Sequence, residues 1–226
     1  MSAFRPWLVV PVLVLAACAP DRIASVDQTA TSSASSLTPN SRGPSASGSV
    51  YEAEEPHFVT AASGAPDVAN PVVSFWAKSG EDRTGTMYYH STTSGRDSTP
   101  LFSLRVRPRS LWRRPDGSLI AQGDSVLITL TLVDPEHLIV DCEPSGLQFS
   151  SHDPARLKFS YAEADDDVNG DGVVNSTDQA LTRVLSIWRR ETPDSPWLLV
   201  PSSRNSEGSF DVEADIGGFT GYAIAY

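Results

Sequence analysis

The chain has 226 residues, a formal net charge of -11 at pH 7 and a pI near 4.7. This acidic balance disfavours nucleic acids and anionic lipid headgroups as partners. Only two cysteines are present, Cys18 and Cys142, so no disulfide framework is expected.

The first eighteen residues have the pattern of a secretory leader. Arg5 supplies a positive charge, and the apolar run Trp7–Ala17 is too short to span a bilayer, which needs about 20 apolar residues. The sequence Leu-Ala-Ala-Cys then ends at Cys18 and resembles a bacterial lipobox, which implies acylation of Cys18 and a membrane anchor. The alternative is ordinary leader cleavage with an incidental cysteine. Because Ala19, and not Asp, follows the cysteine, the resemblance favours the outer membrane or cell surface over the inner membrane.

A change of composition follows the leader. Residues 19–50 are mostly Ser, Thr, Ala, Pro and Gly, and residues 51–70 add acidic side chains and prolines. Such a segment buries too little apolar surface to offset its conformational entropy. We therefore expect a disordered tether over 19–70 and one folded domain over 71–226.

The 71–226 region is rich in short β-type runs separated by Gly and Pro. This texture predicts an all-β fold, an antiparallel immunoglobulin-like sandwich, with one short helix over 176–184 that Ser176 or Thr177 caps. The expected strands cover Val72–Trp76, Thr86–His90, Leu101–Arg107, Ser125–Asp134, His137–Glu143, Arg156–Tyr161, Leu185–Arg190, Trp197–Val200, Ser209–Asp215 and Thr220–Tyr226.

Asp167–Asp178 has the spacing of a twelve-residue calcium loop. Ca²⁺ prefers six to eight oxygen ligands, and such loops supply them at positions 1, 3, 5, 7, 9 and 12. Gly172 stands at position 6, where the loop turns sharply, and Val174 at position 8 is expected to pack inward. The predicted ligands are Asp167, Asn169, Asp171, the Val173 carbonyl, Asn175 and Asp178. The alternative is an acidic surface turn without a metal.

The final Asp178, in place of the usual Glu, makes the loop similar to those of dockerin modules of extracellular bacterial proteins. Dockerins carry the loop twice, whereas this sequence has one copy. The resemblance therefore implies a structural Ca²⁺ that fixes a loop, and not a working dockerin.

A second resemblance concerns the sandwich itself. Pro144–Phe149, followed by Pro154–Tyr161, resembles the core motif of ZU5-type β-domains, and Gly218–Ala225 is similar to the strands that often follow them. The family implies a non-catalytic scaffold or protein-interaction module with no active site to carry over.

Signals for catalysis are sparse. The four histidines, at positions 57, 90, 137 and 152, lack metal-ligand spacing, and no nucleophile elbow or phosphate loop is present. Cys142 lies in an alternating segment with Leu138 and Val140 and is interpreted as a buried, inert thiol.

Two clusters of side chains allow a binding role. The arginines at positions 105, 107, 109, 113 and 114 are interpreted as the solvent face of a strand and its following turn, ahead of an anion site. The aromatics Trp76, Tyr88, Tyr89, Trp112, Trp188 and Trp197 are attributed mainly to the core, although exposed coplanar rings would favour glycan binding.

The predicted function is a non-catalytic, lipid-anchored interaction or scaffold module of the bacterial cell envelope with one structural Ca²⁺ site. Its partner is a protein or a glycan. A carbohydrate-binding module is the first alternative, and an enzyme of unrecognised type is the second.

Overall fold

A computed structural model describes residues 55–90 and 99–226. The predicted leader, its Cys18 and residues 19–54 of the predicted tether lie outside these residues. No helix in the described part of the chain is long and apolar enough to cross a membrane.

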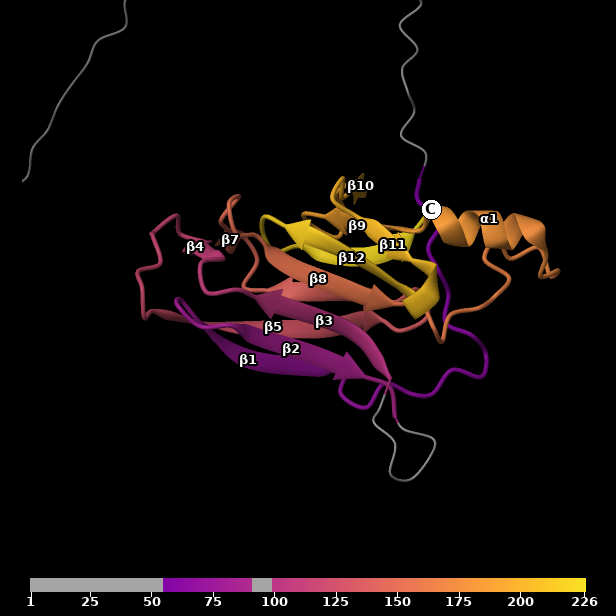
Figure 1. Cartoon of the computed structure of the whole chain (residues 1–226), viewed down its shortest axis with the longest axis horizontal. Coiled ribbons are helices and arrows are strands. Elements are labelled where there is room, and N and C mark those ends of the chain that lie inside the picture. The colour runs from indigo at the N-terminus through magenta and orange to yellow at the C-terminus, as the bar shows by residue number, and fades with distance from the viewer. Residues whose placement is uncertain (1–54, 91–98) are drawn as a thin grey trace, which may run out of the picture. The chain divides into compact units, whose positions relative to one another are not determined.

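Two antiparallel sheets pack face to face, which confirms the all-β sandwich (Figure 1). The six-stranded sheet has the order β1 (Val72–Lys78), β5 (Ser125–Asp134), β6 (Ile139–Glu143), β13 (Gly221–Ala225), β9 (Ser186–Arg190) and β10 (Leu198–Leu199). The five-stranded sheet has the order β11 (Arg204–Ser206), β12 (Asp211–Ile216), β8 (Ala155–Ser160), β3 (Pro100–Val106) and β2 (Arg83–Tyr88).

The smaller elements lie at the two ends of the sandwich. A two-stranded ribbon of β4 (Leu111–Arg113) and β7 (Gln148–Phe149) lies at one end. The helix α1 (Ser176–Val184) lies at the other end, beside the C-terminus (Figure 1), and a single 3₁₀ turn, η1 (Glu207–Ser209), precedes β12. The sequence predicts the bounds of α1 as they are observed.

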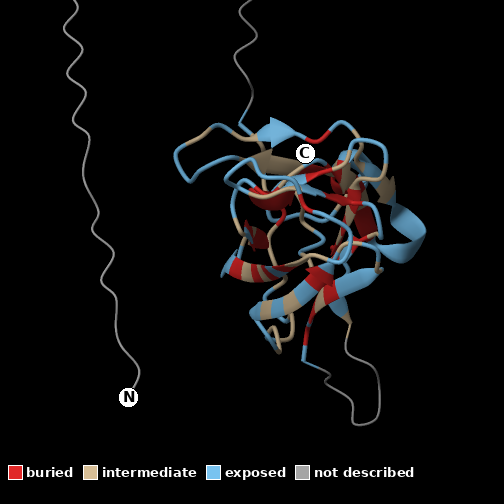
Figure 2. Cartoon of the chain, turned by 90° about the vertical axis from the view of Figure 1, so that its left-hand side faces the viewer, coloured by how far each residue is buried: buried red, intermediate tan, exposed pale blue. Residues whose placement is uncertain are grey.

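The core lies between the sheets, where Figure 2 shows the buried residues in red, and along β5 buried residues alternate with less buried ones. On β8, Leu157 and Phe159 are buried, and Tyr161 just beyond the strand is buried with them, as the alternation predicts. The ring of Phe159 meets that of Phe102 edge to face, with centroids 4.7 Å apart. Burial of such a side chain contributes about 1.5–3 kcal/mol, so these inward rows hold the two sheets together.

The folded unit begins earlier than Pro71, the boundary expected from composition. The N–H of His57 donates to the carbonyl of Tyr226 at 3.1 Å, and that of Val59 donates to Ile224 at 3.1 Å. Val59 is only 2% exposed and belongs to the core. Residues 55–70 therefore extend the sandwich, and they form a compact unit with the rest of the chain to Tyr226. Composition missed this segment because its polar and proline residues surround a single buried valine.

One edge of the sandwich closes by a close approach of β1 to β2. The ring of Phe75 lies where a Cβ on Gly85 would be, with its Cε1 atom 2.3 Å from that position. Glycine is therefore required at position 85, because any larger residue would displace the ring.

Candidate metal-binding loop

The loop Asp167–Asp178 connects the β8 region to β9 and leads directly into α1. Gly170 and Gly172 have positive φ values of 70° and 85°, a conformation that favours glycine. The sharp turn that the motif predicts at Gly172 is therefore present, and Gly170 adds a second turn. They allow the chain to curl around its own side chains.

Backbone N–H groups hold the first carboxylate inside this curl. The two oxygens of Asp167 accept hydrogen bonds from the N–H of Asp171, at 3.1 Å, and of Gly172, at 2.6 Å. The carboxylate of Asp171 accepts in turn from the N–H of Val173 at 2.9 Å. Each carboxylate oxygen has two lone pairs, so a hydrogen bond to one leaves the other free for a cation.

Asp178 closes the loop and starts the helix. Its Oδ1 accepts from the N–H of Asn169 at 3.2 Å, and its Oδ2 accepts from the N–H of Asn175 at 2.8 Å. The residue is only 2% exposed. Hydrogen bonds from the backbone N–H groups, that of Asn175 first, hold the pKa of Asp178 below its usual range. The side chain therefore stays ionised and joins the two ends of the loop.

The helix cap differs from the prediction. Asn175 is the N-cap residue of α1, because its Oδ1 accepts from the N–H of Thr177 at 2.7 Å and it forms a capping box with Asp178. Ser176 and Thr177, the residues expected from composition, are already inside the helix. Asn175 thus combines the role of cap with position 9 of the predicted ligand set.

Two side-chain amides bridge the oxygens of the remaining predicted ligands. The Nδ2 of Asn169 donates to Asp171 at 3.0 Å, and the Nδ2 of Asn175 donates to the Val173 carbonyl at 2.8 Å. A cation would bind the oxygens of Asp171 and Val173 more strongly than these neutral amides do. The donor set, which consists entirely of oxygen atoms, is the one that Ca²⁺ prefers.

The structure contains no group of three His, Cys, Asp or Glu side chains within residues 55–90 and 99–226 that lie close enough together to hold a metal ion. The loop carboxylates are instead held apart on separate backbone N–H groups. The expectation that Val174 packs inward is wrong, since this residue is 63% exposed. The curl is too open beneath position 8 to bury a side chain there.

The C-terminal residue lies beside this loop. A cavity of about 320 Å³ is lined by Tyr226 and His57 on one side and by Asp167 and Asn169 on the other. Burial, reinforced by the negative charges of Asp178 and Asp167, raises the pKa of the Tyr226 hydroxyl. The loop therefore lies beside Tyr226, the residue that follows β13.

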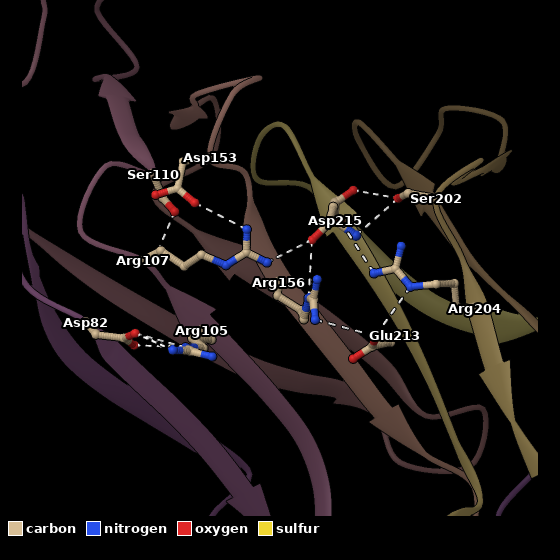
Figure 3. Close-up of polar contacts among 10 residues, drawn as sticks. All are labelled: Asp82, Arg105, Arg107, Ser110, Asp153, Arg156, Ser202, Arg204, Glu213 and Asp215. Atoms are coloured by element: carbon tan, nitrogen blue, oxygen red, sulfur yellow. Dashed lines mark hydrogen bonds and ion pairs between the residues drawn. The ribbon is translucent and has the colours of Figure 1, made fainter.

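The arginine cluster belongs to an ion-paired network on the outer face of the five-stranded sheet (Figure 3). Arg107 contacts Asp153 and Asp215, each at 3.2 Å, and Arg105 pairs with Asp82. The carboxylate of Asp215 also forms ion pairs with Arg156 at 3.3 Å and with Arg204 at 3.4 Å. This arrangement fits the interpretation as a solvent face, because the acids of neighbouring strands neutralise the arginines.

Two other arginines of the cluster make local contacts. Arg113 donates to the Gly117 carbonyl at 2.8 Å and lies over the ring of Trp112, and Arg114 pairs with Asp124 at 3.3 Å. The sequence held one signal for the network: acids alternate along 211, 213 and 215, and bases alternate along 156 and 158.

The aromatic side chains are less buried than expected. Of the six, Tyr89 is buried, whereas Trp76, Tyr88 and Trp112 are exposed and come from three different strands, β1, β2 and β4. The attribution of most of them to the core is therefore wrong.

Cys142 is buried on β6, where burial raises the pKa of its thiol, so the thiolate is disfavoured. Leu138 has a positive φ of 53°, which places the start of the strand at Ile139. Nδ1 of His137 lies 2.9 Å from Asp134. Among the described residues no hydroxyl or thiol forms a hydrogen bond to this imidazole.

Comparisons with protein-family models, with curated proteins and with solved structures find no match for this chain. The resemblances to ZU5 domains and to dockerin loops therefore remain predictions from short motifs.

Proposed function

We propose that this chain is a non-catalytic, lipid-anchored interaction module of the bacterial cell envelope, and that its Asp167–Asp178 loop binds one structural Ca²⁺. The anchor rests on the lipobox that ends at Cys18, and the interaction role rests on the ZU5-like motifs. The single observation that supports the metal site best is the curl of the loop. Within it, backbone N–H groups orient the oxygens of Asp167, Asp171 and Asp178.

The six predicted ligands differ in the oxygen atoms that they offer to the ion. Asp167, Asp171 and Asp178 supply negative charge, Asn169 and Asn175 supply amide oxygens, and Val173 supplies its backbone carbonyl. Calcium, when bound, offsets the mutual repulsion of the three carboxylates. The loop continues through α1 into β9, and it lies beside Tyr226 at a shared cavity. An ion bound in the loop therefore stabilises that end of the sandwich.

Thermal unfolding of the purified chain in excess Ca²⁺ and then in EDTA tests the metal site. A ligand that binds only the folded state adds RT ln(1 + [L]/Kd), about 2.7 kcal/mol at a hundredfold excess over Kd. We expect a higher melting temperature in Ca²⁺, and no such rise in Asp167→Asn.

Asp166→Asn is the matched control, since Asp166 is an exposed neighbour outside the predicted ligand set and the substitution removes the same charge. It should keep the response to Ca²⁺. Equal melting temperatures in Ca²⁺ and EDTA would reduce the loop to an acidic turn, and an equal loss in both variants would indicate a diffuse charge effect.

A further inference from the structure

Two neighbouring cavities meet at the loop between β9 and β10. One, of about 530 Å³, lies between residues 55–58 and residues 193–197, and the other, of about 280 Å³, lies between β6 and the end of β9. Pro193 lines both. The two cavities therefore adjoin at this loop, and together they are here named the Pro193 groove.

Aromatic and proline side chains form its larger lobe. The ring of Trp197 meets that of Phe58 edge to face, with centroids 5.0 Å apart, and Pro56 and Pro196 complete the wall. The guanidinium of Arg190 lies over the ring of Trp197, 4.8 Å from its centroid. The wall thus already holds one guanidinium by a cation–π contact.

The polar lining of the groove is acidic. Glu55 and Asp194 line the larger lobe, and Asp141, Glu143 and Glu191 line the smaller one. Arg190 is the single basic side chain among the described residues that line either lobe.

Most of these carboxylates lack a cationic partner. Glu191 pairs with Arg189 at 2.8 Å. Within the described part of the chain, the carboxylates of Glu55, Asp141, Glu143 and Asp194 make no ion pair. Asp141 is half-buried, and burial together with the charge of Glu143 raises its pKa although the guanidinium of Arg190 lies nearby.

We propose that the Pro193 groove binds an extended peptide segment that carries lysine or arginine side chains. The carboxylates that make no ion pair among the described residues attract the cationic groups of the peptide. Walls of proline and aromatic side chains are typical of grooves that bind extended peptide segments.

Charge argues against the other occupants. A second copy of this chain carries a net charge of -11 and would be repelled. The residues that precede the groove in this chain include Glu52 and Glu54, which have the wrong sign. A neutral glycan would leave the carboxylates unpaired and would compete with Arg190 for the Trp197 ring.

This inference deepens the proposed interaction role by naming the chemistry of the partner, but it does not depend on the calcium loop. The test is fluorescence anisotropy of labelled oligo-arginine and oligo-lysine peptides with the purified full chain, in EDTA and again in Ca²⁺. Binding in EDTA separates the groove from the metal site. We expect saturable binding in both media that weakens as salt is added.

Two double variants with equal loss of charge locate the site. Glu55→Gln with Asp194→Asn removes two charges from the groove, and Asp116→Asn with Glu136→Gln removes two exposed charges elsewhere, so each changes the net charge from -11 to -9. We expect the groove variant to bind about 10-fold more weakly, from roughly 0.7 kcal/mol per lost ion pair, and the control to bind within about 2-fold.

Three results would overturn the proposal. Equal weakening in both double variants would assign the binding to the overall field of the protein. Spermine that displaces the peptides as well as unlabelled peptide does would assign the groove to small polycations. Binding of an N-acetylglucosamine oligomer without binding of the basic peptides would assign it to glycans.

Discussion

On the outer face of the five-stranded sheet, Asp215 is shared by Arg107, Arg156 and Arg204, whereas in the loop Asp167 is held by backbone N–H groups alone. Both regions concentrate carboxylates. On the sheet face, cross-strand register places bases opposite acids, as with Asp215 opposite Arg156. In the loop, no basic side chain stands within Asp167–Asp178, and among residues 55–90 and 99–226 the carboxylates of Asp167, Asp171 and Asp178 make no ion pair.

The difference explains why a metal is proposed for one region and not for the other. An N–H group orients a carboxylate but carries no net charge, so repulsion among Asp167, Asp171 and Asp178 persists until a cation arrives. The network around Asp215 already has its cations, and an added ion would only compete with arginines. The sheet face should therefore be indifferent to Ca²⁺, while the loop should respond to it.

The largest expected effect breaks the network at its centre. Asp215→Ala leaves three arginines without their shared acceptor, and we expect a loss of about 2 kcal/mol in the free energy of unfolding because the group is only a quarter exposed. Urea denaturation measures the loss. Asp82→Ala, in a more exposed pair with Arg105, should cost less, and a loss as large as that of Asp215→Ala would contradict the central place of Asp215.

A smaller effect is expected at the start of α1. Asn175→Ala removes the N-cap bond to Thr177 and should lower the free energy of unfolding by about 1 kcal/mol in EDTA. Urea denaturation in EDTA isolates this term from any metal. Asn175→Asp keeps both the cap and an oxygen at position 9, so it should restore the stability in EDTA and the response to Ca²⁺. If Asn175→Asp does not restore both the stability in EDTA and the response to Ca²⁺, the capping role and the metal-binding role are not combined in this side chain.

Acid should produce the smallest of the three effects. Partial burial raises the pKa of Asp215, but the hydrogen bond from Arg156 and the charges of Arg156, Arg204 and Arg107 outweigh it and hold the pKa below its usual range. A carboxyl group whose pKa is lower in the folded state stabilises the protein above its unfolded pKa, about 3.9, and loses this contribution as pH falls through the folded pKa. Urea denaturation at a series of pH values should show a steady stability near neutrality and a decline below about pH 4.

In Asp215→Asn the same decline should be shallower, because this carboxyl group no longer titrates. An identical decline in the variant and the parent chain would assign the acid sensitivity to other carboxylates, such as those of the loop.

Local pattern was sufficient for much of this fold. The bounds of β5 and α1 match their predictions, because a ten-residue alternating run and a capped helical run carry their own signals. Residues 57–59 were missed because their pairing with the end of the chain joins segments more than 160 residues apart, and no periodicity marks a single buried Val59.

The sites divide in the same way. The calcium motif is local, so the turn at Gly172 could be predicted directly, while its ligand positions stay a prediction. The ion pairs on the sheet face depend on strand register, which places acids beside arginines of other elements. The Pro193 groove depends on loop packing, which brings Phe58 into contact with Trp197. Charge alternation on β8 and β12 hinted at the network, whereas nothing in the local sequence marked the groove.

We propose that Ca²⁺ compensates the carboxylates of the loop, as arginines compensate Asp215 on the sheet face. Isothermal titration calorimetry of Ca²⁺ into the purified chain, repeated with Asp171→Asn and with Asp215→Asn, tests this most directly. We expect one Ca²⁺ to bind per chain. The binding should be abolished or greatly weakened in Asp171→Asn, and its stoichiometry and affinity should be unchanged in Asp215→Asn. No heat of binding, or binding that Asp215→Asn impairs as much as Asp171→Asn does, would contradict it.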